Sequence, residues 1–155
     1  MPTATHTRTA VPTATHTRTA AATATRTVGP TRTPAANCPY SYGYWKTHES
    51  HWPLSSMTLG DDAYGKAELL WLLSRPTRGD ASMILAHQLI AAKLNRANGA
   101  AGPAADTLIG KGDYLLATYG DRLPFYSRPW KPGWTYMIIT AMLLDHYNNS
   151  CSRHW

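Results

Sequence analysis

Every aromatic, leucine and isoleucine side chain of this 155-residue chain lies after residue 37, so only that part can build a hydrophobic core. The first 34 residues also contain no acidic residue, whereas the six tryptophans and nine tyrosines all come later. A segment of such composition cannot bury enough apolar surface to fold alone. We therefore divide the chain into an arm, residues 1–37, and a single domain, residues 38–155.

The arm is a repeat in which threonine occupies 13 of the 16 odd-numbered positions from 3 to 33. The segment TATHTRTA at 3–10 returns unchanged at 13–20, and because the repeat length is even, every threonine falls on one face of an extended chain. Threonine and recurrent proline disfavour a helix, so we expect an extended, β-like or polyproline-like arm, with a floppy linker as the plain alternative. Threonine-rich tracts with proline are typical of O-glycosylated stalks. The candidate acceptors are Thr3, Thr5, Thr7, Thr9, Thr13, Thr15, Thr17, Thr19, Thr23, Thr25, Thr27, Thr31 and Thr33.

The net charge of +6 is unevenly distributed between the two parts. Four arginines give the arm +4, while 11 basic and 9 acidic residues leave the domain at +2. The arginines of the arm are too sparse to follow a phosphate backbone, so we expect no nucleic-acid partner. No stretch reaches the roughly 18 apolar residues of a transmembrane helix, and we expect no membrane insertion.

Apolar periodicity predicts a mostly α-helical domain. The segments expected to be helical are 66–74, 79–99, 103–120 and 131–149. Asp80 is a natural N-cap of the second and Gly99 a natural stop, while Gly110 and Gly112 predict an interruption in the third. One side of the last helix is expected to carry Trp134, Ile138, Ala141, Met142 and Asp145. Before these helices, the aromatic-rich segment is expected to form an irregular cap, which gives a small domain of about four helices.

The two cysteines bracket the domain. Cys38 precedes the first aromatic cluster and Cys151 follows the last expected helix. This placement favours a disulfide that ties the ends of the domain together, which would also indicate an exported protein. Two unpaired thiols of a cytosolic protein are the alternative, and a zinc site is disfavoured because the chain has no CxxC pair.

Three separated motifs look familiar together: YGYWKTHESHWP, ILAHQLIAAKLNRANGA and LLDHYNNSC. They resemble a small domain without an established activity, found at the C-terminal end of many secreted bacterial proteins after long Thr/Pro-rich tracts. The resemblance covers roughly residues 38–151. It implies export, an extracellular stalk and a flanking cysteine pair, and it carries over no catalytic residues. The arm departs from the common T-P-T tract, because alanine, histidine and arginine fill the alternate positions.

The sequence offers little support for an enzyme. His48 and His51 could bind a metal from one face of a helix, but the i, i+4 spacing and the third ligand of a zinc protease are missing. His87 lies among apolar residues of the main helix, where a hydrogen-bonded core histidine is the simpler interpretation. Nucleophile-elbow, P-loop and dinucleotide-binding motifs do not occur. We therefore expect no catalysis, no bound metal and no cofactor.

The aromatic residues before residue 53 suggest a second kind of site. Flat apolar rings stack on sugar faces, although a small domain also uses such rings in its core. Candidate contacts to a glycan or a neighbouring subunit are Tyr40, Tyr42, Tyr44, Trp45 and Trp52. Asn148 begins the weak N-glycosylation sequon Asn-Asn-Ser.

These features predict a secreted or cell-surface structural subunit that assembles with itself into a glycosylated filament. An extended arm of 33 residues would reach on the order of 110 Å at about 3.3 Å per residue, far enough to contact neighbouring subunits. The alternative is a surface-anchored glycan-binding module on a glycosylated stalk. A metal-dependent hydrolase is a third and less favoured class.

Overall fold

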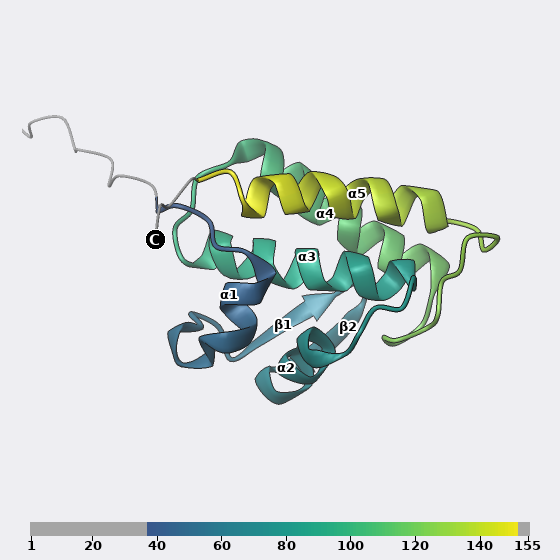
Figure 1. Ribbon diagram of the computed structural model, residues 1–155, viewed down its shortest axis with the longest axis horizontal. Helices are drawn as coiled ribbons and strands as arrows, with labels where there is room; N and C mark the ends of the chain where they lie inside the picture. Colours follow the sequence, from purple (N-terminus) through teal and green to yellow (C-terminus); the bar gives the residue numbers. More distant parts are fainter. Residues whose placement is uncertain (1–36, 152–155) are drawn as a thin grey trace, which may run out of the picture. The chain divides into compact units, whose positions relative to one another are not determined.

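The computed structural model describes residues 37–151, so the predicted arm at residues 1–36 and residues 152–155 lie outside it. The described part is mostly helical, with five α-helices, one 3-10 helix and one β-hairpin (Figure 1). The elements are α1 (Tyr42–Thr47), η1 (Glu49–His51), β1 (Ser56–Leu59), β2 (Asp62–Gly65), α2 (Lys66–Ser74), α3 (Ala81–Ala97), α4 (Pro103–Tyr119) and α5 (Trp134–Asn148). The predicted small helical domain is thus confirmed.

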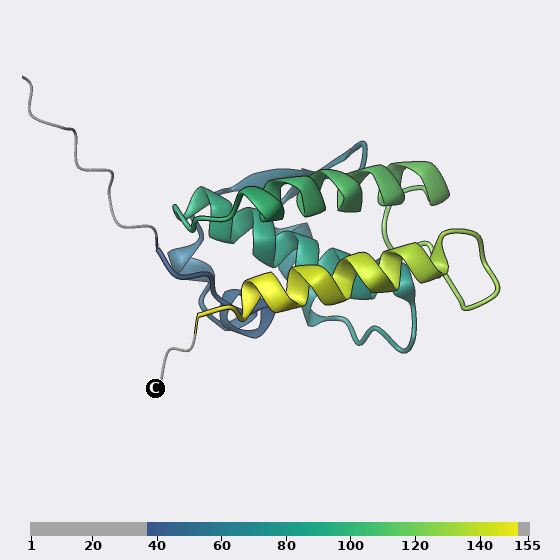
Figure 2. The same ribbon diagram turned by 90° about the horizontal axis from the view of Figure 1, so that it is seen from above.

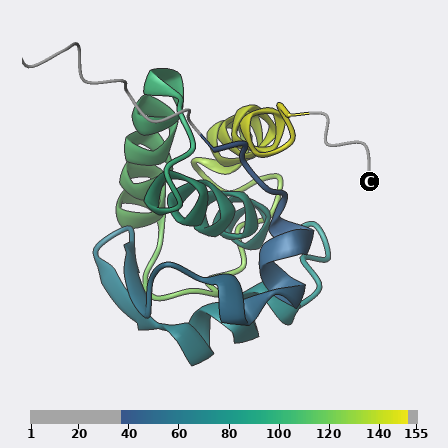
Figure 3. The same cartoon turned by 90° about the vertical axis from the view of Figure 1, so that its left-hand side faces the viewer.

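Helix α3 lies at the centre of the domain. Figure 3 shows α4 and α5 on one side of it and α1, α2 and the hairpin on the other, and Figure 2 shows α4 and α5 flanking it. Thirteen of its 17 residues are buried, whereas a surface helix buries only one stripe. Asp80 caps its start by accepting a hydrogen bond from the Ser82 amide, and Gly99 follows its end with a φ of 83°, both as predicted.

His87 is the core histidine that the sequence predicts. Its Nε2 atom lies 2.9 Å from the carbonyl oxygen of Leu72, which links α3 to α2. Burial lowers the pKa of His87, and the positive charge of Lys46 adds to this effect. The ring is therefore neutral at neutral pH and donates its Nε2 hydrogen to that carbonyl.

The predicted interruption of the third helix is wrong, because α4 runs unbroken from Pro103 to Tyr119. Gly112 instead allows α4 to approach the central helix closely. A Cβ atom at this position would lie 3.1 Å from a methyl carbon of Leu89, a distance tighter than ordinary side-chain contacts. The glycine therefore allows α4 to pack closely on α3. This packing offsets the cost of a glycine inside a helix, about 1 kcal/mol relative to alanine.

Helix α5 differs in part from its predicted face. Its buried residues recur at helical spacing and are Met137, Thr140, Ala141, Leu144 and Asn148. Trp134, Ile138 and Ala141 do pack toward the core, but Met142 and Asp145 are exposed. The outer side instead carries a stripe of apolar side chains, Tyr136, Ile139, Met142 and Leu143, which are 47–67 % exposed. We call these four residues the α5 stripe.

The segment predicted to be an irregular cap contains regular structure. Strands β1 and β2 pair antiparallel with Leu59 opposite Asp62, which leaves Gly60 and Asp61 as a two-residue turn. Gly60 has a φ of 62°, the left-handed conformation that such tight turns require. Alternate residues of the hairpin, among them Met57 and Tyr64, face the core.

The three motifs of the family resemblance meet in the core around Asn95. Its side-chain oxygen accepts hydrogen bonds from the Tyr40 amide at 2.7 Å and from the Trp45 indole at 3.0 Å. Its amide nitrogen donates to the Tyr40 carbonyl and to Asn148, whose own amide donates to Gln88. The motif residues therefore join the start of the domain to α3 and α5, which is a structural role.

The ends of the domain are tied together covalently. Cys38 and Cys151 form the predicted disulfide, with their Cα atoms 5.7 Å apart. Asn37, which we assigned to the arm, already belongs to the domain, because its amide donates to the carbonyl of Gly99 and its side chain to that of Asn98. The domain thus begins at or before Asn37, rather than at Cys38.

Candidate functional site

The two tryptophans among the predicted glycan contacts belong to the core. Trp45 is almost fully buried, and Trp52 is buried beside it. The indole nitrogen of Trp52 donates to the Trp45 carbonyl at 2.8 Å, and that of Trp45 donates to Asn95. Neither ring offers a face to a ligand, so the prediction is wrong for these two residues.

The three predicted tyrosines pack mainly on neighbouring rings. Tyr40 stacks on Tyr44 with 4.0 Å between ring centroids, and Tyr44 stacks on His48 at 4.1 Å. Tyr42, which is partly exposed, lies against His87 at 5.4 Å. Tyr40, Tyr44 and His48 thus form one stack on the protein itself, and Tyr42 forms a separate contact with His87. None of the three tyrosines lines a pocket described below.

His48 is the end of this stack, and His51 lies tilted beside it. The hydroxyl of Tyr44 lies 2.7 Å from Nδ1 of His51, and the two imidazole centroids are 5.6 Å apart. Within residues 37–151, no group of three His, Cys, Asp or Glu side chains is placed to hold a metal ion.

The sequon at Asn148 is not usable in the folded domain. This side chain is almost fully buried, and its amide nitrogen, the atom that would carry a glycan, lies 3.0 Å from both oxygens of Gln88. The prediction of N-glycosylation is therefore corrected. The threonines predicted to carry O-linked sugars all lie outside the described residues.

The outer face of α2 lines two adjoining pockets. Side chains at helical spacing along this face form one wall, and residues 122–128 of the loop after α4 form the other. The two pockets share Trp71, and the loop wall continues from Leu123 in one to Pro124 in the other. We call the pair the α2 groove, and its two parts the Arg122 pocket and the Tyr126 pocket.

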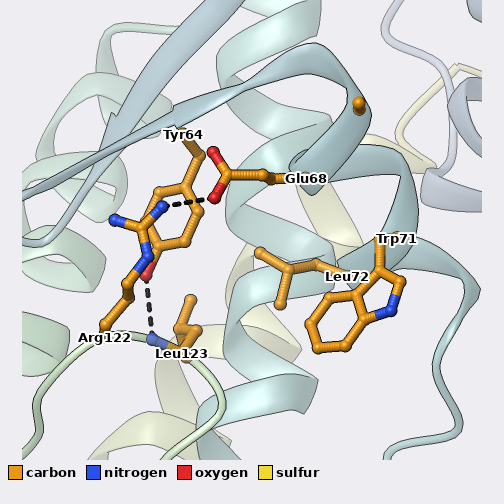
Figure 4. A pocket seen from close by; sticks show the side chains of 7 residues that line it. Tyr64, Glu68, Trp71, Leu72, Arg122 and Leu123 are labelled. Atoms are coloured by element: carbon orange, nitrogen blue, oxygen red, sulfur yellow. Dashed lines mark hydrogen bonds and ion pairs between the residues drawn. The ribbon is translucent and has the colours of Figure 1, made fainter.

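The Arg122 pocket has a volume of about 460 Å³, and its charged side chains are paired with each other. The guanidinium of Arg122 lies 2.5 Å from Glu68 and 4.3 Å from the ring centre of Tyr64, whose hydroxyl accepts a hydrogen bond from the Leu123 amide. Figure 4 shows Arg122 and Glu68 on one side of the pocket and Trp71 on the other. A hydrogen bond from the Gly65 amide and the bond from Arg122 lower the pKa of Glu68, so its charge persists in mild acid.

The Tyr126 pocket has a volume of about 530 Å³ and combines exposed rings with arginines. Trp71 is 49 % exposed and Tyr126 is 56 % exposed. The guanidinium of Arg75 lies 4.4 Å from the ring centre of Trp71, and Arg78 and Arg128 line the same pocket. None of these three arginines forms an ion pair with a carboxylate among the described residues.

Asp80 fixes the position of the Tyr126 pocket. It is only 3 % exposed, and its Oδ1 atom accepts hydrogen bonds from the amides of Ser82 and Ser127 at 3.0 and 2.9 Å. The carboxylate thereby ties the start of α3 to the loop that carries Tyr126. Its other oxygen, Oδ2, is buried and has no hydrogen-bond partner in the described part of the chain. A buried carboxylate oxygen without a donor is costly, and it is unusual in a folded protein.

Two residues of this pocket have an uncommon backbone conformation. Arg78 has a φ of 46° and Tyr126 a φ of 58°, in the left-handed region that costs a non-glycine residue about 1–3 kcal/mol. Such conformations persist where surrounding contacts hold them, and they cluster at binding sites. Here the hydrogen bond from the Ser127 amide to Asp80 is one such contact.

Sequence reasoning missed this groove because its aromatic anchor lies inside an apolar helix. Trp71 stands in KAELLWLLS, where it is easily assigned to the core. The available signal was its position relative to Glu68 and Arg75, which places it on the polar side of α2. The loop residues that face it are some 50 positions later, so their proximity depends on tertiary structure.

Comparisons of the chain with protein-family models, with curated proteins and with solved structures found no match. The resemblance to the C-terminal domain of secreted bacterial proteins therefore stays a prediction. Within residues 37–151, no helix has both the length and the apolar character needed to cross a bilayer.

Proposed function

We propose that the domain is an extracellular saccharide-binding module and that the threonine-rich arm serves as its stalk. The observation that carries this proposal is the half-exposed indole of Trp71, which lies between two pockets that also contain charged groups. Sugars present apolar C–H faces and polar hydroxyl edges, so they are bound by aromatic rings flanked by hydrogen-bonding side chains.

Two further features support this proposal over catalysis and over a cytosolic role. Glycoside hydrolysis requires two carboxyl groups on either side of one bond, whereas each pocket is lined by a single carboxylate, Glu68 in one and Asp80 in the other. The Cys38–Cys151 disulfide suits an oxidising compartment outside the cytosol. Sugars on the threonines of the arm would stiffen it and hold the domain away from the cell surface.

Binding of the full chain to a glycan array tests the proposal. The wild-type chain is expected to bind a subset of saccharides, and the Trp71→Ala variant is expected to bind them about 30-fold more weakly, since truncating a central aromatic anchor typically costs about 2 kcal/mol. The matched control is Tyr114→Ala, which removes an exposed ring from α4 outside the groove. Absence of binding by the wild-type chain, or equal loss in both variants, would contradict the proposal.

Self-association is a second candidate function, and the α5 stripe favours it. The four apolar side chains lie on one helix face, where an antiparallel second copy of α5 could cover them. A two-fold contact joins two copies and cannot extend further. Growth into a filament would therefore need a second contact, which we assign to the predicted arm.

Sedimentation of the full chain tests this second candidate. We expect the wild-type chain to form dimers or larger species, and the double variant Ile139→Glu, Met142→Glu to sediment as a monomer of about 17 kDa. Thr118→Glu adds charge to an exposed position of α4 and should leave association unchanged. A wild-type chain that stays monomeric at high concentration would exclude this contact.

A further inference from the structure

We infer that the ligand of the α2 groove is an acidic oligosaccharide, with its carboxylate or sulfate in the Tyr126 pocket and a neutral sugar in the Arg122 pocket. This inference rests on the proposed function and adds to it the charge, length and orientation of the ligand. It follows from the pairing of the arginines, because Arg122 is bound to carboxylates of the protein and the arginines of the Tyr126 pocket are not.

The arginine of the Arg122 pocket is already neutralised. Arg122 pairs with Glu68 at 2.5 Å and lies 3.7 Å from Asp62, while a further hydrogen bond from its guanidinium reaches the Ala63 carbonyl. A ligand anion in this pocket would have to compete with two carboxylates that belong to the protein. The pocket therefore suits a neutral sugar over the Tyr64–Arg122 stack.

The arginines of the Tyr126 pocket are in the opposite state. Arg75 is engaged with the face of Trp71, and Arg128 with the backbone carbonyl of Arg78 at 3.2 Å, so neither contact neutralises the charge. Three arginines without a carboxylate partner in the described chain line a pocket that also holds two half-exposed rings. Guanidinium groups bind carboxylates and sulfates through paired, charge-assisted hydrogen bonds.

Asp80 favours an acidic sugar over a simple inorganic anion. Its buried Oδ2 atom lacks a hydrogen-bond donor among the described residues, and its negative charge at this pocket opposes a second bare anion. A sugar acid carries its charge on one edge and neutral hydroxyl groups on the others, so it can set the anionic group against the arginines and a neutral edge toward Asp80. A ligand of this class therefore suits the pocket better than an inorganic anion.

The arrangement of the two pockets sets the minimum length of the ligand. Ala67 lines one end of the groove and Arg75 the other, and these eight helical steps span roughly 12 Å at 1.5 Å per residue. Trp71 lies between them and belongs to both pockets. A chain of two or more sugars is thus required to occupy both pockets, with the ring face of one unit against the indole.

Titration calorimetry of the full chain with matched ligands tests the inference. The probes are trigalacturonate and a hyaluronan tetrasaccharide, the methyl ester of each, galacturonate alone and sodium sulfate. We expect at least one of the two acids to bind tenfold or more tightly than its uncharged ester, and to bind more tightly than the single sugar and sulfate. Arg75→Gln and Arg128→Gln should each bring the affinity of the acid close to that of its ester.

The controls separate a failure of this inference from a failure of the proposed function. Lys111→Gln removes a positive charge from an exposed position of α4 and should leave the preference unchanged. If the esters bind as tightly as the acids and Trp71→Ala weakens both, saccharide binding stands and the inference is overturned. If sulfate binds as tightly as the acids, the groove is an anion site only. If none of the oligosaccharides binds, the inference falls, and the glycan array decides on the proposed function separately.

Discussion

Replacing both cysteines of the Cys38–Cys151 disulfide by serine is expected to lower the free energy of unfolding by about 4–5 kcal/mol. The bond joins residues 113 positions apart, and a cross-link that closes so long a loop removes much of the conformational entropy of the unfolded chain. Domains of this size are stable by only about 5–15 kcal/mol, so the loss is a large part of the total. Urea unfolding of the double variant beside the wild-type chain measures it.

A reducing agent provides the control for this prediction. Reduction of the wild-type chain should lower its urea midpoint to that of the double serine variant, and it should leave the variant itself unchanged. Equal midpoints for the oxidised wild-type chain and the variant would show that the contacts of Asn37 and of the Asn95 network already hold the ends together.

The Asn95→Ala variant is expected to lose about 3–5 kcal/mol of stability. The change removes the two hydrogen bonds between Asn95 and the Tyr40 backbone, and it takes the bond to Asn95 from the buried Trp45 indole N–H and from the side-chain oxygen of Asn148. Each buried polar group without a partner costs about 1–3 kcal/mol, and relaxation of the chain recovers part of the sum. Thermal and urea unfolding of the full-length variant measure the loss.

Asn98→Ala is the matched control for this variant. Asn98 lies just after the same helix and is only partly buried, so its truncation should cost less than about 1 kcal/mol. If Asn95→Ala cost no more than Asn98→Ala, the network would be incidental. The convergence of the three motifs would then need another explanation.

Helices α2 to α5 were predictable because each has local signals, whereas the short helix α1 lies in the segment that we expected to be irregular. Lys66–Ser74 was predicted to the residue, and Asp80 and Gly99 mark the two ends of α3 by capping chemistry. The failures arose where tertiary contacts decide. Gly112 suggests a break in the helix when the sequence is considered alone, but in the structure it allows close packing against Leu89. The hairpin was missed because its strands are only four residues long, too short for a clear alternation of apolar and polar residues.

The binding site was predicted less accurately than the fold, also because tertiary contacts decide which residues are exposed. The aromatic cluster around Trp45 is dense in sequence because it builds a core, so its density indicated structure instead of binding. The α2 groove draws on residues from two distant segments, and single residues such as Trp71 and Tyr126 do not stand out in either. The exposure of each ring decides whether it is available to a ligand, and this exposure cannot be predicted from the sequence alone.

An NMR titration of the tryptophan indole signals with trigalacturonate and a hyaluronan tetrasaccharide tests the central claim most directly. The chain has six tryptophans, and each gives its own indole N–H signal. We predict that the Trp71 signal shifts with the ligand while those of the buried Trp45 and Trp52 do not. No shift of Trp71 with either ligand, or a shift confined to Trp45, which contacts Tyr44 of the Tyr40–Tyr44–His48 stack, would contradict a binding site in the α2 groove.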